Sequence, residues 1–430
     1  MNKTTKNIII LAIVAIILAS SFFYFWKNGA IRSGPSQTSE NISGNPFPVV
    51  GKVGSGGSMN FSTSSSVAIS GSSPETSGAL PTLRQISSNP VAGGIGFGDR
   101  GATIIRYVER GTGHIRETRG DSLKDIELSN VTIPKAVQSV WSPNGQSVIM
   151  RYVNEETQNI YSFLVNIAKP STNQNISKNP KNVFLPSSID QISVNPSGDK
   201  IFYLINDANG TVGIISNTDG SQKKQIFQSP IKEWLISWPN KETVALATKP
   251  SSDVPGYLFF LNGKTGAEKK ILSGINGLTA LVSSDTKNIL YSESGDSSVA
   301  LKYHNLKSAA DFEFSFKTLP EKCVWSRVEE SVVYCAVPDE ISTGDYPDIW
   351  YQGLASFSDS IWKVDTKTKF SELILDTQKE TSSGIDITNL VLSDNDEYLL
   401  FTNKKDLSFW SLNLKKQKIN KDYLENSSSF

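Results

Sequence analysis

The chain has 430 residues, and its 42 Lys and Arg residues equal its 42 Asp and Glu residues in number. This balance gives no global field that would draw the protein onto nucleic acid, so a nucleic-acid partner is disfavoured. Apolar residues make up 38% and aromatic residues 10% of the chain, which is enough for a large core and excludes a mainly disordered protein.

A long uncharged run near the N-terminus predicts a membrane anchor. Residues 8–26 (IIILAIVAIILASSFFYFW) contain no charged side chain, and a helix of roughly 20 apolar residues can cross a bilayer. The basic residues on either side of the run give a weak positive-inside bias. We therefore expect a single-pass protein with residues 1–7 in the cytoplasm and the rest on the extracytoplasmic side of the cell membrane.

A cleaved signal peptide is the alternative for this segment. Leu18-Ala19-Ser20 is a passable cleavage site after an apolar run. The aromatic residues from Phe22 to Trp26 extend the apolar stretch past that site, which favours the uncleaved anchor.

Residues 27–81 are predicted to form a flexible linker. Within residues 33–80 there are 14 Ser, 8 Gly and only three charged residues. Such a composition buries too little apolar surface to offset the entropy lost on ordering. The domain that follows is therefore expected to be tethered rather than pressed against the bilayer.

Residues 82–415 carry an internal repeat. Its clearest copy, residues 137–152 (VQSVWSPNGQSVIMRY), combines a strand that ends at Trp141, a Ser-Pro-Asn-Gly turn and a second strand, which predicts a hairpin. Third and fourth strands follow in most copies, and a period of roughly 40 to 50 residues is typical of propellers. The copies recur at similar intervals, with the longest interval before the last, and their equivalent positions are Phe97, Trp141, Val194, Trp238, Val282, Trp325 and Leu392.

These repeats predict an all-β fold, a β-propeller of about seven four-stranded antiparallel blades. Trp141, Trp238 and Trp325 are expected to fill the space between neighbouring sheets. Residues 82–87 (TLRQIS) resemble a fourth strand and should complete the last blade, which protects both edges. Six or eight blades are the alternatives, because the first and last repeats are the least regular. Residues 416–430 are left as a C-terminal tail.

The repeats WSPNG at residues 141–145, NPSGD at 195–199 and WS at 325–326 resemble the WSPDG-type repeat of TolB-like, WD-repeat-like propellers. The resemblance covers residues 82 to about 415 and implies the propeller fold. It implies function only loosely, since such propellers serve as periplasmic binding proteins and as non-catalytic parts of peptidases. Asn replaces Asp in the best turn, and the α/β domain that precedes the TolB propeller is not expected here.

Motifs for catalysis are mostly missing. His114 and His304 have no His or Cys at ligand spacing, so no metal site is expected. There is no Gly-x-Ser-x-Gly motif, which argues against a serine peptidase. The glycines at positions 94, 96 and 98 lack a following helix, so we interpret them as a loop and expect no cofactor. Acidic residues are frequent at turns, and a propeller-fold glycan hydrolase or lyase with paired carboxylates is kept as an alternative.

Cys323 and Cys335 lie on the two strands of one predicted hairpin. In an oxidising compartment this placement favours a cross-strand disulfide, provided that the register brings the Cβ atoms together. Two small buried residues that never pair are the alternative.

Residues 338–360 (PDEISTGDYPDIWYQGLASFSDS) form an insertion between the second and third strands of the sixth repeat. We expect this insertion to overhang the face at which propellers commonly bind ligands, and exposed aromatic residues beside acids are typical of a recognition surface. The sequence is equally consistent with the alternative, in which the aromatic side chains of the insertion fold back onto their own blade. The candidate binding residues are Tyr346, Trp350, Tyr351, Phe357, Asp345 and Asp348.

The first repeat holds five arginines with His114 among them. They could meet an anionic polymer or a carboxylate-rich partner, but a solvated sheet face is favoured. The arginines are Arg100, Arg106, Arg110, Arg116 and Arg119.

The sequence therefore favours a membrane-tethered extracytoplasmic propeller that acts as a non-catalytic scaffold for a protein or peptide partner. The alternatives are a cell-envelope carbohydrate-binding protein and a glycan hydrolase or lyase.

Overall fold

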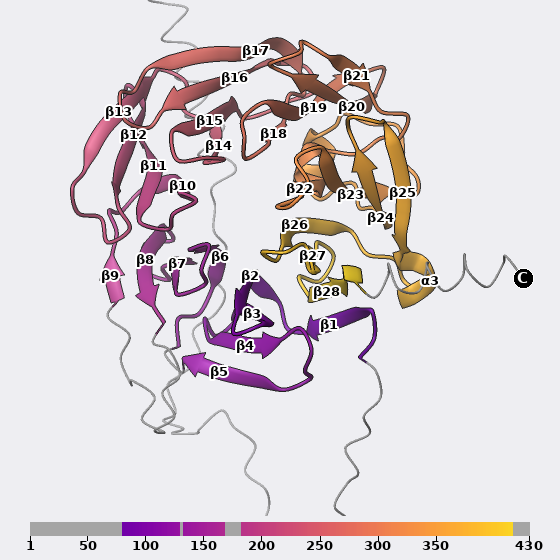
Figure 1. The fold of residues 1–430 in the computed structure, drawn as a ribbon. Coiled ribbons are helices and arrows are strands. Elements are labelled where there is room, and N and C mark those ends of the chain that lie inside the picture. Colours follow the sequence, from indigo (N-terminus) through magenta and orange to yellow (C-terminus); the bar gives the residue numbers. More distant parts are fainter. Residues whose placement is uncertain (1–79, 130–131, 168–181, 416–430) are drawn as a thin grey trace, which may run out of the picture. The chain divides into compact units, whose positions relative to one another are not determined.

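The computed structural model describes residues 80–129, 132–167 and 182–415. Within these residues the chain forms seven four-stranded antiparallel sheets, which stand side by side as the blades of a ring (Figure 1). The predicted all-β propeller is thereby confirmed, with seven blades. Residues 1–7, 8–26 and 416–430, and nearly all of 27–81, lie outside the described residues, so the interpretations made for them stay predictions. No helix in the described part of the chain is long and apolar enough to cross a membrane.

Blades 1 to 3 follow each other along the chain, each with its strands in sequence order. Their strands are β2 (Val91–Asp99), β3 (Ala102–Glu109), β4 (Ile115–Arg119) and β5 (Asp125–Ser129) in blade 1; β6 (Ala136–Trp141), β7 (Ser147–Val153), β8 (Ile160–Asn166) and β9 (Asn182–Phe184) in blade 2; and β10 (Ile189–Val194), β11 (Lys200–Asp207), β12 (Gly210–Asn217) and β13 (Lys224–Ser229) in blade 3.

Blades 4 to 6 continue the same order. They contain β14 (Trp234–Ser237), β15 (Thr243–Thr248), β16 (Pro255–Asn262) and β17 (Glu268–Asn276) in blade 4; β18 (Ala280–Val282), β19 (Asn288–Gly295), β20 (Ser298–Asn305) and β21 (Asp311–Glu313) in blade 5; and β22 (Cys323–Trp325), β23 (Val332–Pro338), β24 (Asp359–Asp365) and β25 (Phe370–Asp376) in blade 6. Short helices flank blade 6: η1 (Pro320–Lys322), α2 (Asp348–Tyr351) and α3 (Thr377–Thr381).

Blade 7 joins the two ends of the propeller. It combines β26 (Ile387–Leu392), β27 (Tyr398–Asn403) and β28 (Phe409–Asn413) with β1 (Leu83–Ser87). Strand β1 pairs antiparallel with β28, with Leu83 opposite Leu412. The predicted closure of the last blade by an N-terminal strand is therefore confirmed, and it removes the unpaired outer edge of β28.

The repeat positions lie at, or within two residues of, the end of the innermost strand of every blade. Their side chains contribute to the apolar clusters between adjacent sheets; for example, Phe97 of blade 1 and Trp141 of blade 2 share one cluster. The side chains of Trp141, Trp238 and Trp325 are all buried. Burial of such large rings between facing sheets is a main source of the hydrophobic stabilisation of this fold.

The turn after Trp141 shows why its residues are of these types. The Ser142 hydroxyl donates to Asn144 Oδ1 at 2.8 Å, and Gly145 N donates to Ser142 O at 2.8 Å. Gly145 has a φ of 66°, and a Cβ atom there would lie 2.1 Å from the Phe97 ring of blade 1. Glycine is required both for the turn and for the close approach of the neighbouring blade.

The glycines at positions 94, 96 and 98 lie within strand β2 and not in the loop that the sequence suggested. A Cβ atom on Gly94 would come within 2.3 Å of the Phe409 ring, and one on Gly96 would come within 3.0 Å of Leu400. These small residues let blade 1 approach blade 7 closely, which is the common reason for Gly inside a strand.

Candidate functional site

The insertion (residues 338–360) connects β23 to β24 and extends over the neighbouring blades. We call the end of the propeller on which it lies the insertion face. Hydrogen bonds tie the insertion to three blades other than its own. They run from Ser252 N of blade 4 to Asp348 Oδ2 (2.7 Å), from Gly344 N to Ser297 O of blade 5 (2.8 Å), and from Lys404 Nζ of blade 7 to Trp350 O (2.7 Å).

Three of the four candidate aromatic residues are buried beneath the insertion. Tyr346 is 0% exposed, and Trp350 and Phe357 are nearly as buried. The Phe357 ring stacks on both others, with centroid distances of 5.9 Å to Tyr346 and 6.4 Å to Trp350. The expectation of an exposed recognition surface does not hold for these three residues, because their rings form a small core of their own. That core includes Val299 of blade 5, so the rings do not fold back onto blade 6 alone.

The remaining candidate residues lie nearer to solvent. Tyr351 is 38% exposed and the adjacent Leu354 is 76% exposed. Asp345 is exposed, and Asp348 is half-buried where it accepts the hydrogen bond from blade 4. The exposed surface of the insertion therefore presents one aromatic side chain, Tyr351, and one large aliphatic side chain, Leu354, among polar and acidic residues such as Asp345.

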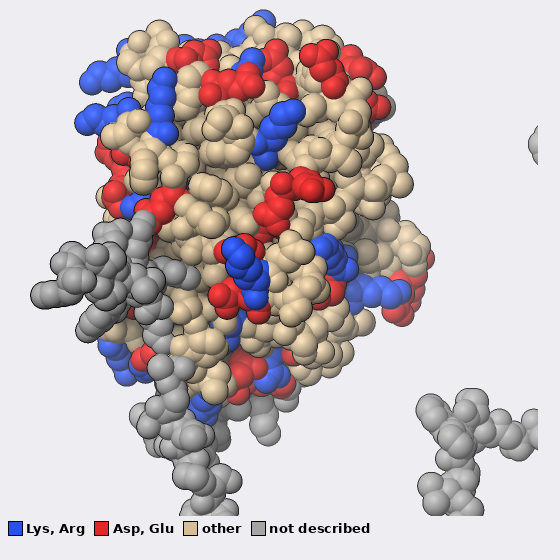
Figure 2. Space-filling view, turned by 90° about the vertical axis from the view of Figure 1, so that its right-hand side faces the viewer, with Lys and Arg blue, Asp and Glu red and all other residues tan. Residues whose placement is uncertain are grey.

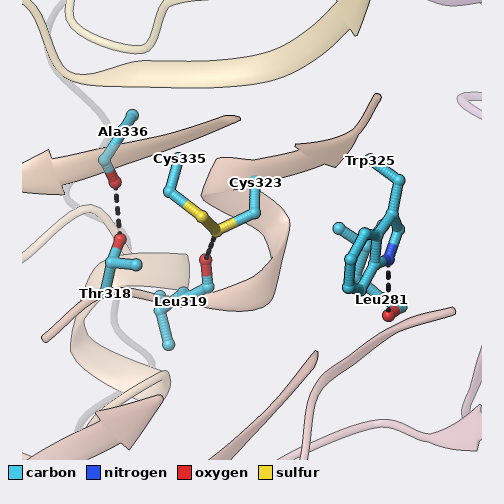
Figure 3. Close-up of a disulfide and its surroundings, with 7 residues drawn as sticks. All are labelled: Leu281, Thr318, Leu319, Cys323, Trp325, Cys335 and Ala336. Carbon is cyan, nitrogen blue, oxygen red and sulfur yellow. Dashed lines mark hydrogen bonds between the residues drawn. A yellow bond between two sulfur atoms is a disulfide. The ribbon is translucent and has the colours of Figure 1, made fainter. Parts of the chain in front are cut away.

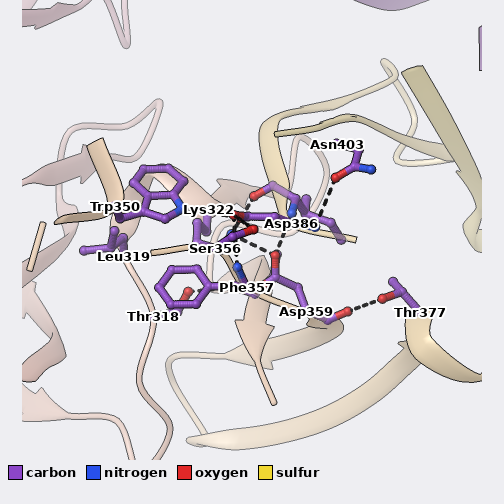
Figure 4. A network of polar contacts seen from close by, with 12 residues as sticks. Thr318, Leu319, Lys322, Trp350, Ser356, Phe357, Asp359, Thr377, Asp386 and Asn403 are labelled. Atoms are coloured by element: carbon purple, nitrogen blue, oxygen red, sulfur yellow. Dashed lines mark hydrogen bonds and ion pairs between the residues drawn. The ribbon is translucent and has the colours of Figure 1, made fainter. Parts of the chain in front are cut away.

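A buried ion network lies directly under the aromatic core (Figure 4). Lys322, at the end of η1, places its Nζ 2.7 Å from Asp359 Oδ2 and 2.7 Å from Asp386 Oδ1, and all three side chains are 0% exposed. The ammonium also donates to Ile387 O at 2.8 Å. Its charge lies over the Trp350 ring, 5.2 Å from the centroid, a cation–π contact that is strongest when both partners are desolvated.

The two carboxylates of the network also hold the insertion. Asp386, just before β26 of blade 7, accepts hydrogen bonds from Trp350 Nε1 at 3.3 Å, Ser356 Oγ at 3.2 Å and Phe357 N at 3.1 Å. Asp359, at the start of β24, accepts one from Ile387 N at 2.6 Å. The network therefore joins blade 6, blade 7 and the insertion in one buried polar centre.

The charge of this centre is not balanced when both carboxyl groups are ionised, because two carboxylates share one ammonium. Burial raises the pKa of Asp359 from 3.8 to about 6, although the Lys322 charge acts in the opposite direction. A proton on Asp359 leaves one cation and one anion in the dry interior, which is the arrangement of lower free energy. The free energy of this buried centre is consequently coupled to pH in the mildly acidic range.

Glu321 lies next to Lys322 in sequence but belongs to a different environment. Thr279 Oγ1 of blade 5 donates to Glu321 Oε2 at 2.7 Å, and the Tyr351 hydroxyl donates to Oε1. Burial raises the pKa of Glu321, and burial next to this carboxylate raises the pKa of Tyr351 as well. A single carboxylate thus links the exposed aromatic residue of the insertion to the inner strands of the ring.

Glu321 also lines a cavity of about 250 Å³ on the inner side of the blades. Most of the wall is apolar, and the residues come from blades 3, 4, 5 and 6. They are Gln191, Leu235, Ile236, Ser237, Ala245, Ala247, Leu258, Thr279, Ala280 and Glu321. An apolar pocket with a few polar groups is the usual form of a ligand site.

Sequence reasoning did not single out Lys322, Asp386 or Glu321. One signal was present: Lys322 lies three residues before the repeat position Trp325, where blades 2 to 5 carry an uncharged residue. A lysine that directly precedes a buried innermost strand and is itself buried requires a buried partner. Its partners lie on later strands, far along the chain, and could not be identified from the repeat.

The structure places a disulfide between Cys323 and Cys335 (Figure 3), which lie opposite each other on β22 and β23. Both residues are buried, and the Cα atoms are 4.0 Å apart. On the same strand, Trp325 Nε1 donates to Leu281 O of blade 5 at 3.2 Å. The disulfide therefore fixes the strand that directly follows Glu321 and Lys322.

The arginines of the first repeat are largely paired within their own blade. Arg106 forms an ion pair with Glu117 at 2.7 Å, and Arg116 forms one with Asp125 at 2.7 Å. Arg119 pairs with the nearby Asp121. On the side of the propeller shown in Figure 2, basic and acidic side chains are likewise interspersed. Arg119 is well exposed, as expected for a solvated sheet face, whereas Arg106 is buried and also donates to Gly145 O of blade 2 at 2.7 Å.

No group of three or more His, Cys, Asp or Glu residues in the described part of the chain is arranged to hold a metal ion. His114 Nδ1 lies 3.3 Å from Glu127 Oε2, and His304 Nδ1 lies 3.8 Å from Asp311 Oδ2. The two histidines belong to blades 1 and 5, as the sequence indicated.

Comparison with known proteins gives the fold. No protein-family model and no curated protein matches the chain. Among solved structures, oligogalacturonate lyase from Vibrio parahaemolyticus is 11% identical with a TM-score of 0.51. The match covers 77% of this chain and 93% of the lyase. The tricorn protease is 12% identical with a TM-score of 0.50. That match covers 79% of this chain and 35% of the protease chain. TolB from Acinetobacter baumannii is 10% identical with a TM-score of 0.43.

The match to TolB covers 64% of this chain and 63% of that protein, so the chain spans less than two thirds of the length of TolB. Together with the seven blades, the lyase and the tricorn protease establish the β-propeller fold. At such identities they show the fold alone, and fold does not determine activity.

Proposed function

We propose that the protein is a non-catalytic scaffold whose propeller binds a protein or peptide partner on the insertion face. We further propose that residues 8–26 tether it to the cell membrane, with the propeller outside the cytoplasm. The observation that supports the scaffold role is the pinned insertion, which presents Leu354 and Tyr351 to solvent from a segment held by three neighbouring blades.

Pinning matters because binding energy is reduced by the cost of ordering the binding surface. The buried network around Lys322 and the hydrogen bonds to blades 4, 5 and 7 meet that cost during folding rather than on association. The exposed apolar side chains are then available to a partner in a defined geometry.

A neighbouring loop extends this apolar surface. Val254, in the β15–β16 loop of blade 4, is 55% exposed, and the same loop contacts the insertion through Ser252 N and Asp348 Oδ2. Exposed apolar side chains grouped on one face, with polar residues around them, are typical of interaction sites. Tyr351, Leu354 and Val254 together form what we call the apolar rim.

A peptide-display library panned on the purified full chain tests the proposal. We expect enriched peptides to bind wild-type protein and to lose about tenfold or more in affinity to the double variant Val254→Ser/Leu354→Ser, because two exposed apolar contacts are removed. Deleting the whole insertion would be less informative, since it would also remove a partner of Lys322.

Leu373→Ser provides the matched control. Leu373 is also exposed but lies on β25, the outermost strand of blade 6, so this variant should bind the selected peptides like wild type. Failure to enrich any peptide, or equal binding by all three proteins, would overturn the scaffold proposal.

The tether has a separate test. If residues 8–26 span the membrane, the full chain remains in the membrane pellet after alkaline carbonate extraction, whereas a chain without residues 1–26 is released. Release of both chains would contradict the anchor without affecting the proposal for the propeller.

A further inference from the structure

The cavity beside Glu321 has a composition that the scaffold role does not explain. Its wall includes Leu235, Ile236, Leu258 and Ala280, while the carboxyl group of Glu321 is its one acid. Placing a carboxylate against an apolar wall carries a desolvation cost, which is recovered when a cation binds there. The position is therefore unfavourable in the empty protein.

No ion pair offsets the charge of Glu321 within the described residues. Lys322, the nearest cation in sequence, directs its ammonium to Asp359 and Asp386 at 2.7 Å each. The side chains that donate to Glu321 are two hydroxyl groups, those of Thr279 and Tyr351. Since a carboxylate can accept about four hydrogen bonds, Glu321 retains acceptor capacity on the cavity side.

The contacts of Glu321 differ from those of the adjacent Lys322, which is a buried charge with a structural role. There, the cation contacts two carboxylates, a carbonyl oxygen and an aromatic ring. Glu321 has neutral donors only, and it lines a cavity instead of a filled core. This difference between neighbouring residues points to a ligand that supplies the missing cation.

We propose that this cavity binds the ammonium or guanidinium side chain of a Lys or Arg residue in the partner peptide, with Glu321 as the specificity-determining group. The aliphatic part of such a side chain would pack on the leucine and alanine wall while its charged end reaches Glu321. A charge-assisted hydrogen bond in a desolvated site would then select basic residues. This inference rests on the proposed function, because it names the chemistry of the same partner.

The apolar rim and the cavity are connected through Tyr351. Its side chain is part of the exposed rim, and its hydroxyl contacts the carboxylate that lines the cavity. A peptide that lies across the rim is thereby placed to direct one side chain toward Glu321. The rim would supply affinity, and the cavity would select the residue.

The cavity can be tested without a peptide. In saturation-transfer NMR with the full chain, n-pentylamine is the probe for a lysine side chain and n-pentanol is its uncharged counterpart. We expect transfer to n-pentylamine with wild-type protein and about tenfold or more weaker binding to Glu321→Gln, because one charge-assisted contact is lost. Equal binding of the amine to both proteins would overturn the proposal.

Two further variants serve as controls. Glu268→Gln makes the same change at an exposed position on β17 and should bind the amine like wild type. Ala280→Leu leaves Glu321 intact but fills the cavity, so it should abolish transfer to the amine. Retained amine binding by a folded Ala280→Leu protein would place the ammonium elsewhere and contradict the proposal.

Peptides distinguish this inference from the proposed function. Peptides selected on the full chain should share a Lys or Arg, and replacing that residue with norleucine should weaken binding about tenfold to wild type but little to Glu321→Gln. Selected peptides that bind at the rim without any basic residue would leave the scaffold role standing and refute the cation pocket. Amine binding without any selected peptide would refute the scaffold role while leaving the pocket, with free amines as its ligands.

Discussion

Blade 1 and blade 6 both concentrate charged side chains, yet they use them in opposite ways. In blade 1, Arg119 pairs with Asp121, two positions further along the chain, and both side chains are more than half exposed. In blade 6, Lys322 reaches Asp359, two strands further along the chain, and Asp386 at the start of the next blade, and all three are fully buried. The number of charges in a segment is therefore a poor guide to a site, whereas burial and the distance bridged along the chain are good ones.

The energetic consequences of the two arrangements differ accordingly. Ion pairs at a sheet surface gain little, because water and salt already solvate each partner. A buried pair that loses one member leaves an uncompensated charge in the interior. Substitutions of exposed and of buried charged residues should thus change the free energy of unfolding by very different amounts.

The largest effect is expected for Lys322→Met. This change keeps the aliphatic volume but leaves Asp359 and Asp386 buried without their cation, and should lower the free energy of unfolding at pH 7 by about 3–5 kcal/mol. Urea denaturation of the full chain measures it. The same substitution at Lys264, whose pair with Glu242 is well exposed, should leave the stability unchanged within error. A loss at Lys322 no larger than at Lys264 would contradict the structural role of the network.

The next effect concerns pH. Because burial raises the pKa of Asp359 from 3.8 to about 6, the folded protein binds this proton more tightly than the unfolded chain does. The contribution of Asp359 to stability is therefore fully present below about pH 4 and is lost as the pH rises to about 6, a change on the order of 3 kcal/mol. Asp359→Asn should remove this decline.

The measurement compares the free energy of unfolding of wild type and Asp359→Asn at pH 4, 5, 6 and 7. Relative to wild type, the variant should become more stable as the pH rises through this window, and the difference should level off above it. Groups outside the network titrate equally in both proteins, so the difference isolates the buried centre formed by Asp359, Lys322 and Asp386. Parallel curves would show that Asp359 is ionised throughout.

The disulfide should contribute less to the free energy of unfolding than Lys322 does. It closes a loop between residues 12 positions apart, for which the restriction of the unfolded chain corresponds to about 2–3 kcal/mol. The double variant Cys323→Ala/Cys335→Ala should show this loss in urea denaturation, and adding a reductant should lower the stability of wild type only. A reductant effect on the double variant would mean that the measured loss has another origin.

Local signals were sufficient to predict the blades. The turn after Trp141 combines residues whose conformational preferences act within a few neighbouring positions, so a hairpin could be read from them directly. Repetition of that frame gave the ring, and the strand-like character of residues 82–87 gave its closure. In each case the information lies in neighbouring residues or in their period.

The candidate site was less predictable because its contacts are not local. The sequence identified the insertion and its place between β23 and β24, but Trp350 is buried by Asp386 of the next blade and by Lys322 at the end of η1. Exposure of an aromatic residue in a long loop depends on such partners. The glycines of β2 are a similar case. Gly94 is needed because of the Phe409 ring, which lies in the adjacent blade 7 but far away along the chain.

The smallest effect is expected in blade 1, for Arg119→Gln. Arg119 donates to both carboxylate oxygens of Asp121 at 2.8 Å, a geometry as good as that of the Lys322 network. The two side chains are 52% and 59% exposed, however, and are close neighbours in sequence. Water replaces the lost contact, and the pair fixes no distant part of the chain.

Thermal unfolding of Arg119→Gln should therefore coincide with that of wild type at low and at high salt. The variant keeps the Arg119 backbone carbonyl that accepts a hydrogen bond from Arg84 at 3.0 Å, so only the side-chain pair is tested. A loss comparable to that of Lys322→Met would show that pairing geometry, and not burial, sets the value of an ion pair in this propeller. The distinction between the two pairs would then fail, because the Arg119–Asp121 pair and the Lys322 network differ in burial far more than in the distances between their charged atoms.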